Sequence, residues 1–223
     1  MSFTIHTVEQ RSPEWYAIRL GLLTGSCANE MLATIKSGGE AAGRRNLRVR
    51  LMLERVTGKS QESDFVSDDM QVGIEREAEA RAYYEAESCH LVSCVGFLRH
   101  TELMAGCSPD GVIGDFEGLL SVKCPKPATH LEYVKSGQIP TEYLRQTTHE
   151  MWMSGAQWTD FVSFNPDFPE PLRLKLVRVK ATALGLPMYD AAARAFLAEV
   201  DREVEAVRTL ANLPAVLQEA ASA

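Results

Sequence analysis

An aspartate and a lysine lie close together in the stretch GCSPDGVIGDFEGLLSVKCP, residues 106–125. Side chains alternate between the two faces of a strand, so Ser121 and Lys123 of GLLSVKCP point to one face and Val122 to the other. The Ser-Pro-Asp-Gly turn should end the preceding strand, and a hairpin would then bring Asp110 beside Lys123. In phosphodiester hydrolysis such a carboxylate holds a hard divalent cation, while the lysine orients or deprotonates the attacking water and offsets charge on phosphorus.

The same residues also fit a surface hairpin without any chemistry, because Pro-Asp-Gly is a common turn sequence. Many metal-dependent nucleases carry a glutamate two residues before the lysine, and here that position is Ser121. A serine hydroxyl is a weak, neutral ligand, so the missing carboxylate should lower the affinity for a divalent metal unless another acid replaces it. The spacing alone leaves both interpretations open.

Helical segments precede these strands and must pack around them. The stretch RSPEWYAIRLGLLTGSCANEMLA predicts a short helix, a glycine-containing loop and a second helix that opens near Ser26, which suits an N-cap. AAGRRNLRVRLMLERVTGK predicts an arginine-rich helix that ends near Gly58. SDDMQVGIEREAEARAYYEAE predicts another helix, capped by Ser67 or Asp68, with Glu77 in its middle turns.

Short apolar runs bounded by Gly, Pro, Asp and Asn follow, which is typical of strands. The predicted strands are HLVSCVGFLRH, LMAGCSPDGVIG, GLLSVKCP, TDFVSFNP and RLKLVRVKA. Gly137 and Pro140 divide the intervening ATHLEYVKSGQIPTEYLRQTTHEMWMSG into two helices. We therefore predict an α/β fold with one central mixed β-sheet flanked by helices. The predicted parts of this single domain, residues 1–223, are N-terminal helices (about 10–87), a sheet core (about 88–180) and a C-terminal helix (about 186–212).

The chain is acidic overall, with a formal net charge of −7 and a pI near 5.3. This charge counts against broad, nonspecific coating of nucleic acid, although a local basic channel can still grip DNA. The arginine-rich helix is a candidate wall for such a channel, or else an ordinary solvated helix face. Its arginines are Arg44, Arg45, Arg48, Arg50 and Arg55.

The start of the chain lacks the basic and apolar regions of a signal peptide, and no apolar run approaches the ~20 residues needed to span a bilayer. The cysteines are scattered and contain no C-x-x-C pair, which favours reduced thiols over disulfides or a zinc site. His149 is interpreted as a half-buried packing residue rather than a metal ligand. We therefore expect a cytoplasmic protein that binds no membrane.

Several segments, taken in order, resemble those of a known nuclease family. They are EWYAIRLGLLTGS, VGIERE, GCSPDG, GLLSVKCPKPATH and YLRQTTHEMW, and the resemblance that they carry spans roughly residues 9 to 165. Together they resemble the lambda-type alkaline exonucleases of the viral-recombinase (YqaJ-like) family, which belongs to the PD-(D/E)xK nuclease superfamily. The resemblance implies the restriction-endonuclease-like core of that superfamily.

For function, the resemblance implies a Mg²⁺- or Mn²⁺-dependent exonuclease of phage or prophage origin, acting in a bacterial host. Such enzymes degrade one strand of linear double-stranded DNA from its 5′ end and leave a 3′ overhang for homologous recombination. The implied partners are double-stranded DNA ends, a single-strand annealing protein of the same recombination system and further copies of the chain in a homotrimeric ring. Two alternatives stay open: a PD-(D/E)xK endonuclease of restriction or repair type, and a catalytically inactive DNA-end-binding recombination protein.

The resemblance also assigns roles to individual residues. Asp110 matches the metal-binding aspartate, Lys123 matches the catalytic lysine, and Val122 would offer its backbone carbonyl to the metal. Glu77 matches a helix glutamate near the metals. A further group matches residues that hold a 5′-terminal phosphate, to which guanidinium, hydroxyl and amide groups can donate hydrogen bonds. These residues are Arg19, Ser26, Ser108 and Gln146.

Ser121 departs from the glutamate that is commoner in the family. Three explanations stay open. Another carboxylate has replaced that glutamate, the change inactivates the site, or the chain is a noncatalytic relative. Two residues could supply a relocated carboxylate. Glu77 is the preferred candidate, because the resemblance already places it near the metals. Glu150 is the weaker candidate; it lies four residues after Gln146, so the two share one helix face.

Overall fold

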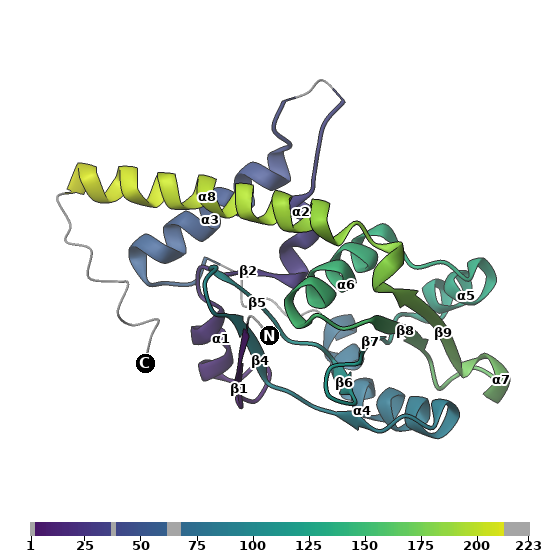
Figure 1. The fold of residues 1–223 in the computed structure, drawn as a ribbon. Coiled ribbons are helices and arrows are strands. Elements are labelled where there is room, and N and C mark those ends of the chain that lie inside the picture. The colour runs from purple at the N-terminus through teal and green to yellow at the C-terminus, as the bar shows by residue number, and fades with distance from the viewer. Residues whose placement is uncertain (1–2, 37–38, 62–67, 212–223) are drawn as a thin grey trace.

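The computed structural model describes residues 3–36, 39–61 and 68–211, and it shows helices packed around two β-sheets (Figure 1). Its strands are β1 (Phe3–His6), β2 (Leu23–Thr24), β3 (Val92–Ser93), β4 (Phe97–His100), β5 (Ala105–Cys107), β6 (Gly111–Ile113), β7 (Gly118–Lys123), β8 (Trp158–Phe164) and β9 (Leu174–Lys180). Its helices are α1 (Pro13–Arg19), α2 (Ala28–Met31), α3 (Ala42–Thr57), α4 (Asp68–Ser88), α5 (Pro127–Ser136), α6 (Thr141–Ser154), α7 (Glu170–Arg173) and α8 (Leu186–Ala211), with 3₁₀ turns η1 (Gly25–Cys27) and η2 (Ala181–Ala183). None of the described helices is long and apolar enough to cross a membrane.

Within the described residues, the strands form a four-stranded sheet in the order β1-β4-β5-β2 and a five-stranded sheet in the order β3-β6-β7-β8-β9. In the five-stranded sheet β7 and β8 run parallel, and the other neighbouring strands run antiparallel. This mixed sheet, flanked by helices, confirms the predicted α/β class. The sequence had predicted that all the strands join one sheet. Instead, β1, β2, β4 and β5 form a separate four-stranded sheet.

The division into two sheets begins inside two of the predicted strands. HLVSCVGFLRH separates into β3 and β4 before Phe97, and LMAGCSPDGVIG separates into β5 and β6 at residues 108–110. A Cβ on Gly96 would lie 2.3 Å from the carbonyl oxygen of Val8, so the backbone passes too closely for any side chain. Pro109 has no N–H to donate to a strand ladder. The chain therefore changes sheets at both points, which hydrophobic periodicity alone does not signal.

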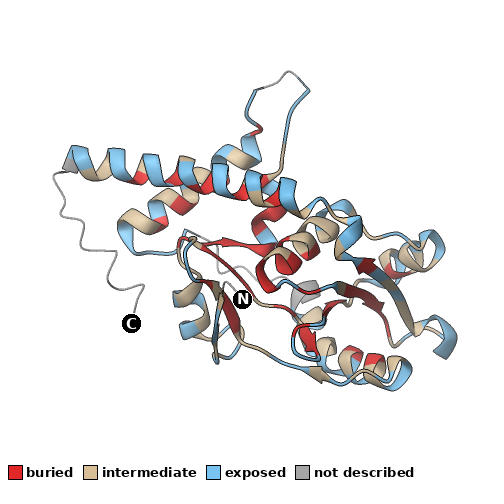
Figure 2. Cartoon of the chain, viewed as in Figure 1, coloured by how far each residue is buried: buried red, intermediate tan, exposed pale blue. Residues whose placement is uncertain are grey.

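Strand β7 is the centre of the fold, because it pairs with β6 on one side and with β8 on the other. Leu119 belongs to a core cluster that includes Met151 of α6, whereas Leu120 and Val122 belong to a cluster that includes Tyr84 of α4. Buried residues accordingly follow β7, β8 and the inner side of α6 (Figure 2). Since side chains alternate along a strand, positions 119, 121 and 123 face α6, and positions 120 and 122 face α4.

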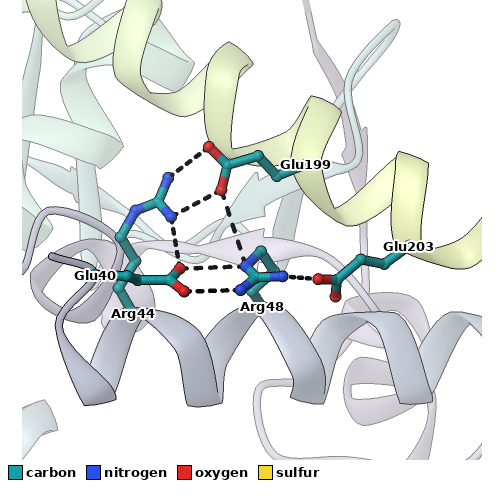
Figure 3. Close-up of polar contacts among 5 residues, drawn as sticks. All are labelled: Glu40, Arg44, Arg48, Glu199 and Glu203. Carbon is teal, nitrogen blue, oxygen red and sulfur yellow. Dashed lines mark hydrogen bonds and ion pairs between the residues drawn. The ribbon is translucent and has the colours of Figure 1, made fainter.

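The arginine-rich helix α3 packs against the long helix α8 through a network of ion pairs (Figure 3). Arg44 Nη1 donates to Glu199 Oε2 at 2.7 Å and to Glu40 Oε1 at 2.8 Å. Arg48 Nη2 donates to Glu40 Oε2 at 2.7 Å, and Arg48 also pairs with Glu203. These arginines neutralise acids of α8 and of the segment before α3. The helix that was a candidate channel wall is therefore not a row of uncompensated positive charges.

The N-terminal helices follow the predicted order, with one correction. Helix α1 begins with Ser12 as its N-cap, whose Oγ accepts from the backbone N–H of Trp15 at 3.2 Å. Ser26, predicted as the next N-cap, lies instead inside η1, with its Oγ 3.1 Å from Thr24 Oγ1. The cap prediction was wrong because a 3₁₀ turn precedes α2. Of the two cap candidates for α4, Ser67 lies outside the described residues. The other candidate, Asp68, is the first residue of the helix.

His149 of α6 is fully buried and is held in its neutral form. Its Nε2–H donates to the Gly106 carbonyl at 3.0 Å, so Nδ1 accepts from the Tyr189 hydroxyl at 2.8 Å. Burial lowers the pKa of His149 to about 4, although the hydrogen bond to Gly106 acts in the opposite direction. The predicted packing role is confirmed, and the burial is complete rather than partial.

We predict that His149 makes the protein less stable in mild acid. An unfolded histidine takes up a proton near pH 6.5, whereas His149 in the folded chain stays neutral down to about pH 4. The unfolded chain then binds more protons, so the free energy of unfolding falls as the pH drops through 6.5 toward 4. Between pH 7 and pH 5, the His149→Gln variant should lose about 2 kcal/mol less than the wild type in urea unfolding. Equal losses in the two proteins would contradict this.

Candidate active site

Asp110 lies where the chain passes from the four-stranded sheet into the five-stranded sheet, one residue before β6. Its Oδ2 accepts a hydrogen bond of 2.7 Å from the backbone N–H of Val122. Gly111 pairs with Leu120 in the antiparallel β6–β7 ladder, so the next position of this register places Asp110 level with Ser121. The predicted hairpin is confirmed, and it brings the aspartate to the end of β7 that carries the lysine.

Lys123 ends β7 on the face that α6 covers. Its Nζ lies 5.1 Å from the ring centroid of Tyr143 on that helix. Burial alone would lower the pKa of Lys123, but the negative charges of Asp110 and Glu150 act in the opposite direction, and the pKa is raised overall. The side chain is thus held as an ammonium among acids.

Glu150 projects from α6 with only 2% of its surface exposed. Its Oε1 accepts from Gln146 Nε2 at 2.9 Å, whereas its Oε2 is buried with no hydrogen-bond partner among the described residues. Burial, followed by the nearby charge of Asp110, raises the pKa of Glu150 to about 8, and Gln146 and Lys123 oppose the rise. A buried carboxylate oxygen without a partner costs free energy, and a bound cation would satisfy it.

Glu77 approaches Asp110 from α4, on the other face of the sheet. Each of its oxygens lies 3.6 Å from an arginine, Oε2 from Arg11 and Oε1 from Arg81. Burial and then the charge of Asp110 raise the pKa of Glu77, while the two arginines oppose the rise. These residues line an open cleft of about 520 Å³. The sequence had drawn attention to the glutamate but not to its two arginines.

Arg19 and Ser108 are joined through Trp15. The Arg19 guanidinium lies over the Trp15 indole, with its Cζ 3.8 Å from the ring centroid. Trp15 Nε1 donates to Ser108 Oγ at 2.7 Å, and Ser108 Oγ donates onward to the Gly96 carbonyl at 2.8 Å. The i, i+4 spacing of Trp15 and Arg19 on α1 is the signal that could have revealed this arrangement.

The turn η1 packs directly against α6 beside these groups. A Cβ on Gly25 would lie 3.3 Å from Glu150 Oε1 and 3.4 Å from Gln146 Cγ, so a side chain here would require its neighbours to move. Ser26 follows this glycine and is exposed. The turn therefore brings its exposed hydroxyl close to the helix that carries the amide and the buried acid.

The buried thiol of Cys107 connects the metal candidates with the phosphate candidates. Burial raises the pKa of Cys107, the charge of Glu150 adds to the rise, and Arg19 opposes it. The two groups of predicted residues also meet directly, because Gln146 donates to Glu150 and Ser108 lies two residues before Asp110. The site residues that the structure gathers in this region are Arg19, Ser26, Glu77, Ser108, Asp110, Ser121, Val122, Lys123, Gln146 and Glu150.

A divalent cation fits the donor chemistry of this region. The carboxylates of Asp110 and Glu150 are hard oxygen ligands of the kind that Mg²⁺ and Mn²⁺ take, and the Val122 carbonyl remains a predicted third oxygen. Among the described residues, no three His, Cys, Asp or Glu side chains come close enough together to hold a metal ion by themselves. Magnesium commonly binds through one or two carboxylates together with waters and substrate phosphates, so an open site with two carboxylates suits it.

The family profile described as "YqaJ-like viral recombinase domain" matches residues 14–157. The chain belongs to this family. The match runs from α1 to the start of β8, and it contains all the site residues that the structure gathers around Asp110.

Solved exonuclease structures share the fold of this YqaJ-like chain. The alkaline exonuclease LHK-Exo from Laribacter hongkongensis is 34% identical, with a TM-score of 0.80, over 91% of this chain and 100% of its own. A structure of LHK-Exo in complex with dAMP has the same identity and TM-score, over 90% of this chain and 98% of its own. A phage-related exonuclease from Haemophilus somnus 129PT, 12% identical with a TM-score of 0.63 over 84% and 95% of the two chains, shares the fold alone. No match was found among curated proteins.

We predict that the structural and chemical roles of Asp110 can be separated. Asp110→Asn keeps an acceptor for the Val122 N–H, so the free energy of unfolding in chelator should fall by less than ~1 kcal/mol. Asp110→Ala leaves that N–H without its partner and should cost about 1–3 kcal/mol. Urea unfolding followed by circular dichroism measures both. Losses of similar size in the two variants would show that the charge, rather than the hydrogen bond, stabilises the hairpin.

Proposed function

We propose that this YqaJ-like chain is a divalent-metal-dependent exonuclease that degrades one strand of linear double-stranded DNA in the 5′→3′ direction. Its product would be a 3′ overhang for phage-type homologous recombination in the bacterial cytoplasm. The observation that carries the proposal is that the β6–β7 hairpin holds Asp110 at the end of β7 that carries Lys123, where the charges of Asp110 and Glu150 both act on the lysine. Exonuclease activity is further supported by the 34% identity to LHK-Exo over 90% of the chain.

The residues of the site would have different roles at the scissile phosphate. Asp110, a second carboxylate and the Val122 carbonyl would hold the cation. When bound, Mg²⁺ or Mn²⁺ supplies positive charge that polarises the scissile phosphate. Lys123, an ammonium among carboxylates, orients the attacking water and offsets the negative charge that develops on phosphorus. The buried surroundings strengthen these electrostatic effects relative to bulk water.

Recognition of the 5′ end would depend mainly on Arg19. A guanidinium can bind phosphate through two parallel hydrogen bonds, and the indole of Trp15 holds its plane in one orientation. Ser26 and Gln146 would add donors from η1 and α6, which pack against each other. Ser108 contributes less in this arrangement, because its hydroxyl proton is already donated to a backbone carbonyl.

Two further observations favour this function over the alternatives. LHK-Exo has been solved in complex with dAMP, a mononucleotide of the kind that an exonuclease releases, which favours an exonuclease over an endonuclease. A buried carboxylate oxygen without a partner serves no packing purpose, so Glu150 favours a catalytic protein over an inactive end-binding one.

The proposed partners follow from the charge of the chain. With a net charge of −7, and with Arg44 and Arg48 paired to acids, the chain is poorly suited to hold duplex DNA by charge alone. A homotrimeric ring around the duplex would retain DNA by topology instead. The 3′ overhang would then be passed to a single-strand annealing protein of the same recombination system.

We predict that the protein releases nucleotides from linear duplex DNA in Mg²⁺, but releases none in chelator and none from closed circles. Asp110→Asn and Lys123→Ala should each lower the rate about 100-fold or more, because each removes a group that acts directly on the phosphate. Release of acid-soluble nucleotide from labelled DNA measures the rate.

The matched control for this experiment is Asp115→Asn, which makes the same change at an exposed position in the turn of the same hairpin. It should keep the wild-type rate. Cleavage of closed circles would identify an endonuclease instead, and binding of DNA ends without release would identify an inactive protein.

We predict that a 5′-phosphate end is digested faster than a 5′-hydroxyl end. Arg19→Lys keeps the charge but loses the paired hydrogen bonds, so the preference should fall by roughly 10- to 100-fold. Ser108→Ala should change the preference by less than about threefold, because its proton is used within the protein. Equal rates on the two kinds of end in the wild type would exclude this phosphate site.

A further inference from the structure

We propose that Glu150 supplies the second metal-binding carboxylate, and that Ser121 and Glu150 represent a transfer of the acid from strand β7 to helix α6. The inference rests on the proposed function and deepens it by naming one residue of its site. It also reverses the expectation from the sequence, which preferred Glu77 as the relocated acid.

The two acids approach β7 from different faces of the sheet. The side chains of Ser121 and Lys123 point to the face of β7 that α6 covers. Glu150 projects from α6 toward this face; Asp110 and Lys123 act on it as they also act on Glu77, so the face rather than the charge separates the two acids. The Glu150 carboxylate is thus delivered to the space between α6 and β7 where a glutamate at position 121 would place its own.

Glu77 approaches the site from the opposite face. Helix α4 packs against the other side of β7, and both oxygens of Glu77 lie 3.6 Å from guanidinium groups, those of Arg11 and Arg81. A carboxylate between two arginines is already balanced, and movement toward a cation would break both ion pairs. Its position instead suits it to hold the two arginines along the cleft beside Asp110.

Glu150 has the opposite character. It is 2% exposed, one oxygen is fixed by Gln146, and the other oxygen is buried without a partner among the described residues. A buried polar oxygen without a partner is costly, so stability alone gives no reason for this acid. A cation shared with Asp110 would satisfy the open oxygen. Gly25 packs closely on the other oxygen, which keeps the carboxylate in place.

Ser121 is the complement of this arrangement. Its side chain is buried, with 2% of its surface exposed, and is short, so it extends from the α6 face of β7 by only one hydroxymethyl group. A glutamate at both positions would place two buried carboxylates near Asp110, and the like charges would repel one another. A short residue on the strand and an acid on the helix therefore belong together.

The test moves the carboxylate back to the strand. Glu150→Ser should weaken binding of Mn²⁺ to the DNA-free protein by at least about 10-fold in isothermal titration calorimetry. The double variant Ser121→Glu/Glu150→Ser has the same composition as the wild type and should regain an affinity within about threefold of it. Ser121→Glu alone, which adds another acid beside Asp110, should not bind Mn²⁺ more tightly than the wild type.

Two further variants serve as controls. Glu150→Gln keeps the shape of the side chain and an acceptor for Gln146, so it should fold normally and still lose Mn²⁺ affinity. Glu142→Gln removes an exposed acid from the same helix and should leave the affinity unchanged. Thermal unfolding in chelator confirms that each variant is folded.

Two outcomes would overturn the inference. Mn²⁺ affinity that survives in Glu150→Gln but falls in Glu77→Gln would return the role to Glu77. A folded double variant that binds Mn²⁺ no better than Glu150→Ser would show that the two positions are not equivalent.

Nuclease assays of the same proteins separate this inference from the proposed function. If the wild type releases nucleotides from linear DNA and Glu150→Gln keeps the full Mn²⁺ affinity and rate, only the inference fails. If the wild type binds Mn²⁺ through Glu150 and releases no nucleotides, only the proposed function fails.

Discussion

The hydrogen bond from the Val122 N–H to the Asp110 carboxylate fixes the point at which the two sheets meet. Before it, the chain belongs to β5 of the four-stranded sheet, and after it the chain enters the β6–β7 hairpin of the five-stranded sheet. The position of the aspartate is therefore set by backbone pairing rather than by a flexible loop. Sites built on strands and helices are held more precisely than sites on loops. The helices α4 and α6 then bring their glutamates to this fixed carboxylate from the two faces of β7.

The charges around this point are balanced unevenly. On the α4 face, Glu77 lies between two arginines. On the α6 face, Lys123 is the positively charged group that interacts with Asp110 and with Glu150. Carboxylates that lie close together in buried surroundings coexist only when positive charge is near. Arg11, Arg81 and Lys123 act on Glu77, whereas Lys123 is the positive group that acts on Glu150, so a divalent cation between α6 and β7 would restore the balance there.

The sequence predicted the parts of the structure that obey local rules. The break between α5 and α6 at Gly137 and the β6–β7 hairpin follow from glycine and turn chemistry. The second sheet was missed, because the requirement for Gly96 comes from a segment that packs on it from far away in the chain. The choice between Glu77 and Glu150 was equally out of reach, since it depends on which face of β7 each helix covers. The sequence thus proposed the candidate residues as a set, but not how they are divided between the two faces of β7.

The close packing of Gly25 against Glu150 links the mutational histories of two elements. A larger side chain at position 25 would press on the carboxylate and on Gln146, so its effect depends on what α6 carries. This is epistasis with a steric cause. A larger residue at position 25 should be tolerated when position 150 carries a small residue, and should be harmful when position 150 carries glutamate. An acid at position 150 therefore favours a residue without a side chain at position 25 of the 3₁₀ turn.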